Sequence, residues 1–465
     1  MQPLCSRSIV PHPPSISAVA AVRQPRGRLL LFAFGDFAFN LFWQSVMLFL
    51  LFYYTDALLL PISVAATLFM VASIWDGIAN FIAGLVVDRR QGRIDYGLVL
   101  TVGAVPLALS FVLVYLPPLV PGWLGIAGIF VGHLLFRTAY AAVNVPYLAM
   151  TARISLDAGD RAYVAGCRML FGTLAAVLVA LCTIPIGSWF TGSKEAASTF
   201  AVASVLFAGI GAIILTIVGR TYREAAPVTA PTPVPVRAAL KSLLANRAFV
   251  TLNVAVMAMI VAITVLNKSV LYYFKYALGD ADGGQLALAS MSAVSAIAIP
   301  LWMGLRNMLG LRTLWFTAAG FSILGLALFA ALDIRQVATM QFFLIGMQAM
   351  IVGLNFIFWA MLPNTIEYGE ATTGLHVEGT VFGLAALLQR VAIGIATAIL
   401  GWSFDSAGYV ANVEQSEATL EAIRWIVALV PLSFLALSCA AMALNPLGRG
   451  EHRRVVRELA KSKTG

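Results

Sequence analysis

The sequence predicts an all-α membrane protein with twelve transmembrane helices, arranged as two halves of six helices each. Three observations support this prediction. The composition is 60% hydrophobic and only 11% charged, which is more apolar surface than the cores of a soluble protein of this length can bury. Apolar windows of membrane-spanning length, about 20 residues, recur along the chain. A proline-rich segment then divides these windows into two equal groups.

The apolar windows set the predicted helices. Lipid forces every backbone polar group to find a partner within the protein, which favours helices, and the sequence lacks the residue alternation of a membrane barrel. We place the spans at residues 29–54, 59–87, 96–117, 122–150, 162–190, 197–219, 248–275, 284–305, 312–332, 337–362, 381–404 and 422–445.

A linker separates two halves at residues 29–220 and 248–445. Four prolines fall within ten residues of this linker, residues 221–247, and predict an extended segment. The first span of each half ends alike, with aromatic runs at 51–56 and 271–276. This likeness favours an internal repeat, an architecture that binds substrate between its halves.

The charge distribution predicts the orientation of the chain. The net charge is +9, and most Lys and Arg residues lie in the two tails, 1–28 and 446–465, and after spans 2, 4, 6 and 8. This asymmetry follows the positive-inside rule, so both termini are predicted in the cytoplasm and the chain in the cell inner membrane. We therefore read the basic residues as a topology signal, and expect no nucleic-acid partner. The first tail lacks an apolar core long enough for a cleaved signal.

A carboxylate within a span gives the first indication of function. Asp76 is the only charged residue between Leu59 and Val87, and a charge near the bilayer centre costs about 2.5–3.5 kcal/mol on insertion scales. Such residues persist where they face a cavity or handle a charge. The sequence therefore predicts a transporter with Asp76 in its pathway.

Several motifs follow one another along both halves of the chain. They are Gly35-Asp36-Phe37, Phe52-Tyr53-Tyr54-Thr55-Asp56, Ile74-Trp75-Asp76, Asn144-Val145-Pro146-Tyr147, Asp160-Arg161 through Arg168, Ile366-Glu367-Tyr368-Gly369-Glu370 after span 10, and Gln389-Arg390. In this order they resemble the glycoside–pentoside–hexuronide:cation symporters of the major facilitator superfamily, a family typified by the melibiose permease. The loop after span 2, with Gly84, Asp88, Arg89 and Arg93, resembles the signature loop of the superfamily, and Gly84 is expected to allow a close approach of helices. An ordinary cytoplasmic loop is the weaker interpretation.

The resemblance implies a cation-coupled sugar carrier. It gives Asp36 and Arg168 the roles of the sugar-binding carboxylate and guanidinium, and it gives Asp76 a place in the cation site. Arg390 falls where the family has a basic residue. The chain also departs from the family, because Asn80 and Asn144 stand where acids are usual, Leu148 replaces a sugar-stacking aromatic residue, Gly35 replaces a lysine, and Asn364 stands in the loop after span 10 where an aspartate is usual.

Two pairs of opposite charge are predicted at matched depth. Asp76 lies at the depth of Arg137 near the midplane, and Asp36 lies at the depth of Arg168 in the cytoplasmic half. A structural salt bridge is an equal alternative for the first pair, whereas the resemblance favours a substrate role for the second. Asn80 shares a helix face with Asp76, four residues away.

The reduced number of acids bears on the coupling ion. Na⁺ prefers several oxygen ligands, so we rank H⁺ coupling through Asp76 above facilitated diffusion, and both above Na⁺. No other cofactor, no metal site and no catalytic residue is expected. His133 is a second candidate for titration, although a hydrogen-bonded core histidine is the favoured interpretation.

The charges within the spans also bear on the substrate. Four are basic and two are acidic, a surplus that attracts anions. The basic residues are Arg137, Arg168, Lys268 and Arg390, and the acidic residues are Asp36 and Asp76. We therefore expect a small-molecule substrate, a sugar derivative, and hypothesise an acidic saccharide such as a hexuronide or a sulfonated sugar. Candidate substrate-binding residues are Asp36, Arg168, Asn144, Arg390 and Arg137; candidate coupling residues are Asp76 and Asn80.

Two other functions stay open. A lysolipid carrier of the same branch would need a hydrophobic lateral cleft, and a non-transporting sensor derived from a carrier is conceivable because of the missing acids. An enzyme is not expected, since the sequence has no phosphate-binding glycine loop, metal-ligand spacing or nucleophile–base motif. We expect a monomer embedded in the lipid bilayer.

Overall fold

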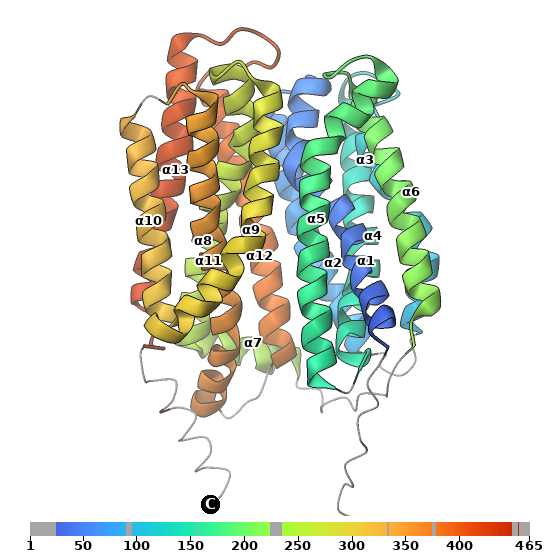
Figure 1. Ribbon diagram of the computed structural model, residues 1–465, viewed down its shortest axis with the longest axis vertical. Coiled ribbons are helices and arrows are strands. Elements are labelled where there is room, and N and C mark those ends of the chain that lie inside the picture. The colour runs from blue at the N-terminus through green and yellow to red at the C-terminus, as the bar shows by residue number, and fades with distance from the viewer. Residues whose placement is uncertain are drawn as a thin grey trace, which may run out of the picture.

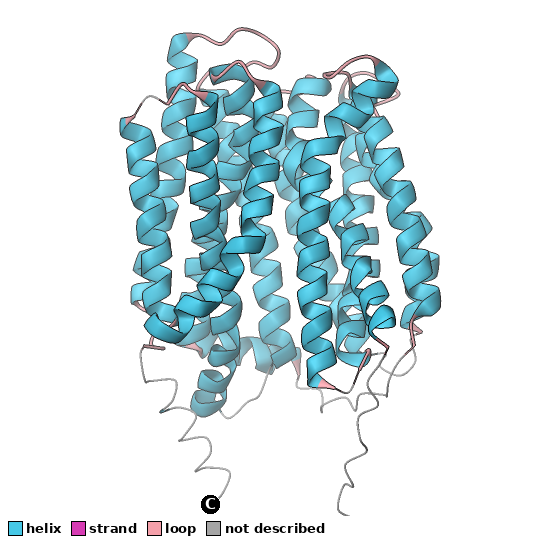
Figure 2. Ribbon diagram, in the orientation of Figure 1, coloured by secondary structure: helices cyan, strands magenta, loops and turns pink. Residues whose placement is uncertain are grey.

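The computed structural model describes residues 25–89, 95–155, 157–223, 235–332, 334–373, 378–448 and 454. Over these residues the chain is all-helical (Figure 2). Its helices are α1 (Arg26–Phe52), α2 (Ile62–Arg89), α3 (Tyr96–Tyr115), α4 (Trp123–Arg153), α5 (Ala158–Thr191), α6 (Ala197–Thr221), α7 (Val236–Ala245), α8 (Arg247–Tyr272), α9 (Ala281–Leu309), α10 (Leu311–Ala331), α11 (Val337–Thr373), α12 (Glu378–Ser406) and α13 (Glu417–Ala443).

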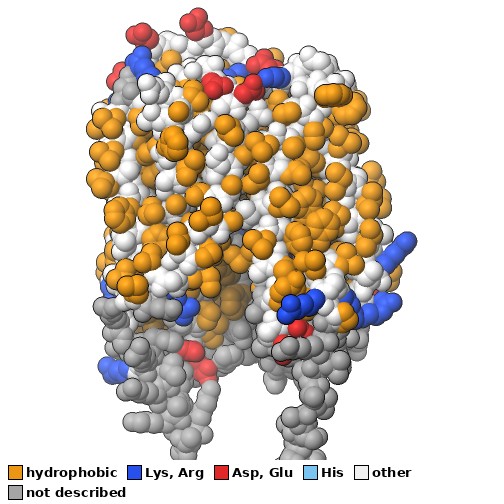
Figure 3. Space-filling model, viewed as in Figure 1, with side chains coloured by type: hydrophobic (Ala, Val, Ile, Leu, Met, Phe, Trp, Pro, Cys, Tyr) orange, Lys and Arg blue, Asp and Glu red, His pale blue; other side chains and the backbone are white. Residues whose placement is uncertain are grey.

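The described residues contain twelve helices that are long and apolar enough to cross a membrane, which confirms the predicted number of spans. They form two bundles side by side, α1–α6 and α8–α13 (Figure 1). The start of α1, the end of α13 and the short helix α7 lie at one end of the molecule, here called the linker end. Between the two ends, apolar side chains cover most of the face seen in Figure 3, as lipid requires.

The internal repeat is visible in the local structure. Each bundle's first long helix ends in one turn of π-helix, at Tyr53–Ala57 after α1 and at Tyr273–Ala277 after α8. Both turns are closed in the same way, because the N–H of Leu58 donates to the Tyr53 carbonyl and that of Leu278 to the Tyr273 carbonyl. The aromatic runs predicted as equivalent therefore adopt the same backbone. We call the end that holds both π-turns the far end.

The two halves meet chiefly along two helix pairs, α2 with α12 and α5 with α9, and α1 also contacts α8. In the first pair, glycines on α12 allow very close approach. A Cβ at Gly401 would lie 2.2 Å from the Ala66 Cβ, and one at Gly394 would lie 2.9 Å from the Met70 carbonyl oxygen. Small residues at such a crossing maximise packing where lipid supplies no hydrophobic drive.

Two sequence predictions of irregular structure are wrong. The linker is not extended throughout, since α7 begins directly after Pro235, where proline's missing N–H is tolerated. Its Ser242 hydroxyl lies 2.8 Å from that of Thr373. The segment after residue 362, predicted as a loop, continues α11 across Pro363 to Thr373. Residues 1–24 and 224–234, which include most of the predicted N-terminal tail and the proline run, lie outside the described residues.

Candidate functional site

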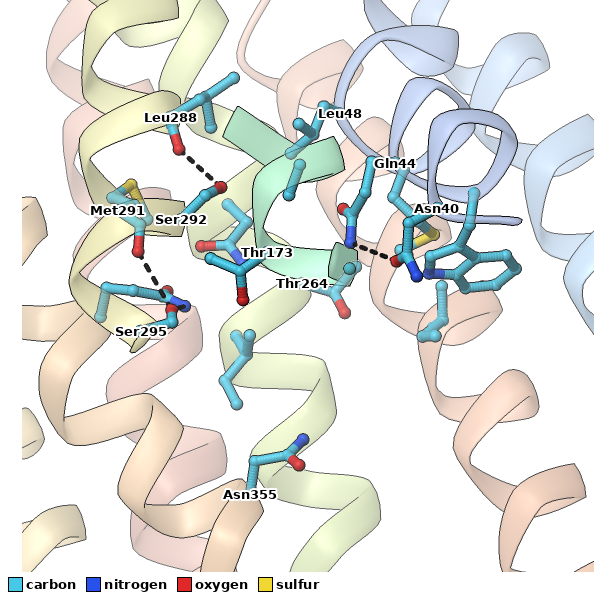
Figure 4. A pocket seen from close by; sticks show the side chains of 18 of the residues that line it. Asn40, Gln44, Leu48, Thr173, Thr264, Leu288, Met291, Ser292, Ser295 and Asn355 are labelled. Carbon is cyan, nitrogen blue, oxygen red and sulfur yellow. Dashed lines mark hydrogen bonds between the residues drawn. The ribbon is translucent and has the colours of Figure 1, made fainter. Parts of the chain in front are cut away.

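A cavity of about 610 Å³ lies between the two halves, within the range of small-molecule sites. The N-terminal half contributes α1 and α5 to its wall, and the C-terminal half contributes α8, α9, α11 and α12. Figure 4 shows polar side chains facing this space from both sides, including Asn40 and Gln44 on α1, and Ser292 and Ser295 on α9. On the outside, the surface is hollowed between the halves toward the linker end (Figure 3).

One face of α1 lines the cavity. Asp36, Asn40, Gln44 and Leu48 follow one another at intervals of four, with Trp43 beside them. Residues at this spacing lie above one another on a helix. The Asn40 side-chain amide donates to the Asp36 carbonyl at 2.9 Å, and that of Gln44 donates to the Asn40 side-chain oxygen at 3.3 Å. The result is a ladder of polar groups along the cavity wall.

Asp36 and Arg168 form the ion pair that the sequence predicts. The Arg168 Nη2 lies 3.1 Å from the Asp36 Oδ1, and Nη1 donates to the Thr151 hydroxyl at 2.8 Å. Both members of the pair are about one-sixth exposed and both line the cavity. Behind them, the Tyr147 ring lies 5.1 Å from the guanidinium carbon, and it also fills the space where a side chain at Gly35 would stand. The pair can therefore meet a ligand while protein supports its other side.

Asp76 has a different environment. Its side chain is fully buried, and its Oδ2 lies 3.5 Å from the Arg137 Nη1 and 3.3 Å from the Arg390 Nε. The Asn80 amide nitrogen donates to Oδ1 at 2.9 Å. The pair with Arg137 was predicted; the second guanidinium at Asp76 was not. All three neighbours are hydrogen-bond donors, so they suit a carboxylate.

The contact between Asp76 and Arg390 crosses between the halves. Asp76 lies on α2 and Arg390 on α12, whereas Arg137 lies on α4 in the same half as Asp76. The Arg390 guanidinium also stacks 3.8 Å from the ring of Trp43, which lines the cavity. Trp43 therefore separates the cavity from the buried charges and touches both.

His133 is a satisfied core residue in this structure. Its Nε2 accepts from the Arg137 Nε at 3.2 Å, and its Nδ1 lies 3.3 Å from the Tyr54 hydroxyl. An arginine only donates, so Nε2 carries a lone pair and the ring proton belongs on Nδ1. The geometry matches a neutral histidine that orients Arg137.

Several predicted residues lie away from the cavity wall. Asn144 and Arg137 are buried and do not line the cavity, and Arg390 stands behind Trp43. A Cβ at Gly84 would meet nothing within 4 Å, so the close helix approach expected there is wrong. Arg89 is exposed at the end of α2, while the Asp88 side chain and Arg93 lie outside the described residues.

Sequence reasoning missed most of the cavity's polar wall. The residues concerned are neutral, and several lie on spans without a recognised motif: Asn40, Trp43, Gln44, Thr173, Thr264, Asn267, Ser292, Ser295, Gln348 and Asn355. Gln389 was quoted within a motif and Lys268 was counted among the charges, but neither was given a role. The four-residue spacing that begins at Asp36 was the available signal on α1.

The far end is closed between the halves by a network around Asp56. The Lys275 Nζ lies 3.0 Å from the Asp56 Oδ1, and the hydroxyl groups of Tyr276 and Tyr409 also donate to the carboxylate. Burial, and to a lesser degree Asp56, raises the pKa of Tyr409, so its phenol is protonated and donates. The Asn412 amide donates to the Asp56 carbonyl at 2.8 Å. These contacts join the π-turns of both halves.

Comparisons with known proteins find sugar transporters that match most of the chain. A family model described as MFS/sugar transport protein matches residues 31–449. The isoprimeverose transporter of Lactiplantibacillus pentosus is 26% identical and covers 88% of this chain and 86% of its own. The glucuronide carrier protein homolog of Escherichia coli (strain K12) is 25% identical, with 93% and 95% covered. The putative sulfoquinovose importer of the same strain is 24% identical, with 89% of each chain covered.

A solved structure supports the fold. The crystal structure of a D-xylose-proton symporter superposes with a TM-score of 0.64 at 15% identity, and covers 90% of this chain and 96% of that one. At this sequence identity, the structural similarity supports only the fold.

Proposed function

The chain belongs to the MFS/sugar transport protein family, in its glycoside–pentoside–hexuronide branch, and from this premise we propose that it carries an acidic sugar derivative across the inner membrane together with H⁺. Members of the family are transporters of sugar derivatives and not enzymes, and this chain is a multi-pass secondary transporter of that kind. The proposal adds the charge of the substrate, the coupling ion and the orientation.

The cavity wall supports a sugar as substrate. Asp36 accepts and Arg168 donates hydrogen bonds at the same point of the wall, and the α1 ladder of Asn40 and Gln44 adds further donors and acceptors. A polyhydroxylated ligand can pair with such groups on every side. This polarity also favours a sugar over a lysolipid, whose acyl chain would need a wall of apolar side chains.

The environment of Asp76 argues against Na⁺, which leaves H⁺ as the coupling ion that we propose. The carboxylate is surrounded by the donor groups of Arg137, Arg390 and Asn80, whereas a Na⁺ site needs several oxygen acceptors. Among the described residues no group of three or more His, Cys, Asp or Glu side chains could hold a metal ion.

Protonation of Asp76 would weaken its contact with Arg390, which joins α2 of one half to α12 of the other. H⁺ binding would thereby loosen the interface along which the halves must rock in alternating access. If transport is not coupled to H⁺, the ion pair between Asp76 and Arg390 serves only as a structural contact between the halves.

The remaining assignments rest on charge and on the cavity. The positive-inside pattern supports a cytoplasmic location of the linker end and of both termini. The hollow then opens to the cytoplasm, and the Asp56 network closes the far side. A monomer suffices, because one chain supplies both walls of the cavity.

Uptake into proteoliposomes tests the proposal. The purified protein would be assayed with labelled neutral and acidic glycosides under imposed gradients of H⁺ or of Na⁺. Accumulation of an acidic glycoside driven by the H⁺ gradient alone is expected. Accumulation driven by Na⁺ would contradict the coupling ion, and equilibration without accumulation would identify a facilitator.

A further inference from the structure

Lys268 occupies an unusual position in the cavity wall. It lies on α8 of the C-terminal half, lines the cavity and is only 5% exposed. Its Nζ crosses to the other half, where it donates to the Met47 carbonyl at 3.1 Å and lies 3.8 Å from the centre of the Phe69 ring. Both contacts are favourable to a cation, yet neither brings a negative charge.

The charge of Lys268 is not offset by a neighbouring acid. In the described part of the chain, no carboxylate lies within ion-pairing distance of Nζ, whereas Asp36 is held by Arg168, and Asp76 by two arginines. Arg137 adds to the surplus, because its guanidinium carbon lies 5.5 Å from the centre of the same Phe69 ring. A buried cation without a counter-ion is costly, and an anion at its side would offset that cost.

Hydrogen-bond acceptors lie on the same wall. Asn267, the neighbour of Lys268 on α8, and Gln348 on α11 both line the cavity. The side-chain oxygen of each is buried and accepts no hydrogen bond from the described residues, although the Gln348 amide nitrogen donates to the Ser295 hydroxyl at 3.1 Å. Buried acceptors of this kind normally have a donor, and the hydroxyl groups of a sugar are donors.

We infer that Lys268, Asn267 and Gln348 form an anion subsite on the C-terminal wall of the cavity, which takes the carboxylate or sulfonate group of a monoanionic sugar. Lys268 binds the anionic group, and the two amides accept from hydroxyl groups next to it. Asp36 and Arg168 bind other hydroxyl groups from the opposite wall, so the ligand touches both halves. This inference rests on the proposed function, and it adds the residues that recognise the charge of the substrate.

Matched pairs of ligands and variants test the subsite. The ligands would be a hexuronate with its parent hexose, methyl glucuronide with methyl glucoside, and a 6-sulfonated hexose with the same hexose. Binding to the detergent-purified full chain would be measured by calorimetry, and exchange would be measured in proteoliposomes. Lys268→Gln removes the charge but keeps a donor for the Met47 carbonyl, and Lys268→Arg keeps the charge. Asn267→Leu removes the neighbouring acceptor without changing the charge of the cavity, and it leaves Lys268 in place.

For at least one pair of ligands, we expect the anion to bind at least about tenfold more tightly than its neutral partner. Lys268→Gln should abolish this preference by weakening the anion about tenfold more than its neutral partner, Lys268→Arg should keep the preference, and Asn267→Leu should weaken both ligands of a pair alike. Neutral ligands that bind as well as the anions, or an anion preference that survives in Lys268→Gln, would overturn the inference and leave sugar transport standing. No binding and no exchange of any ligand by the wild type would instead contradict the proposed function, and the subsite with it.

Discussion

Asp36 and Asp76 are both carboxylates within spans of the N-terminal half, and both are paired with arginine, but their surroundings differ. Asp36 has one arginine partner, is 17% exposed and lines the cavity. Asp76 has two, is fully buried, and is joined through Arg390 to the other half. The difference suggests a division of labour, in which Asp36 meets the substrate and Asp76 links the binding of H⁺ to the movement of the halves.

The largest effect on substrate binding is expected at Asp36. Asp36→Asn removes a charged acceptor that faces the cavity and leaves Arg168 without its anion, so substrate binding should weaken roughly 10- to 100-fold. Calorimetry on the purified variant checks this. Asp405→Asn, outside the cavity wall, serves as the control and should bind like the wild type. If Asp36→Asn binds substrate as strongly as the wild type, Asp36 does not contact the substrate, and the proposed difference between Asp36 and Asp76 is wrong.

The two arginines at Asp76 should differ in their effect on stability. Arg137 is 1% exposed and lies within one half, so Arg137→Gln should destabilise the protein by about 3 kcal/mol, at the low end for a broken buried pair because Arg390 remains. Arg390 is 22% exposed and lies between the halves, so Arg390→Gln should change stability by about 1 kcal/mol or less.

Thermal unfolding in detergent measures both variants, and Arg137→Gln should have clearly the lower midpoint. Arg390→Gln should instead change which end of the cavity a cysteine reagent reaches, because it removes a contact between the halves. Equal midpoints would mean that the two arginines contribute equally to stability, which would contradict the proposed difference between them.

At the far end, a small effect on the closure of the two halves is expected. Asp56→Asn weakens the pair with Lys275 and the bonds from Tyr276 and Tyr409, and should raise labelling of cysteines placed at that end by about fivefold, the equivalent of about 1 kcal/mol. Asp282→Asn is the matched control, since Asp282 and Lys194 pair across the halves but are both more than 60% exposed. Equal labelling of the two variants would show that the Asp56 network does not hold this end closed.

The sequence was sufficient for the architecture and for some of the site. The twelve spans and the two halves follow from apolar length, and the repeat from the likeness of 51–56 to 271–276. The pairs Asp36–Arg168 and Asp76–Arg137 follow from charge and depth, because an unpaired charge within a span is rare. Each of these predictions depends on apolar or charged residues, and the free energy of placing such residues in water or in lipid limits where they can lie.

The remainder of the site depends on how the two halves pack. The sequence places Arg390 on a span but does not say that it reaches Asp76 on another helix of the opposite half. Neutral residues such as Asn267 and Gln348 lack the large insertion free energy of a charged residue, so the sequence does not distinguish them from other residues of a span. Gly84 was expected at a close helix contact, yet it faces open space, whereas Gly401 supports the tight contact of α12 with α2. Interhelical packing decides such cases.

The division of labour between the two carboxylates is tested most directly by comparing exchange with accumulation in proteoliposomes, for the wild type, Asp36→Asn and Asp76→Asn. The ligand would be the best-transported glycoside of the uptake panel, with and without an imposed H⁺ gradient. We predict that the wild type exchanges and accumulates it, that Asp76→Asn exchanges it at a similar rate but does not accumulate it, and that Asp36→Asn does neither. H⁺-driven accumulation by Asp76→Asn, or exchange by Asp36→Asn at the wild-type rate, would contradict the account.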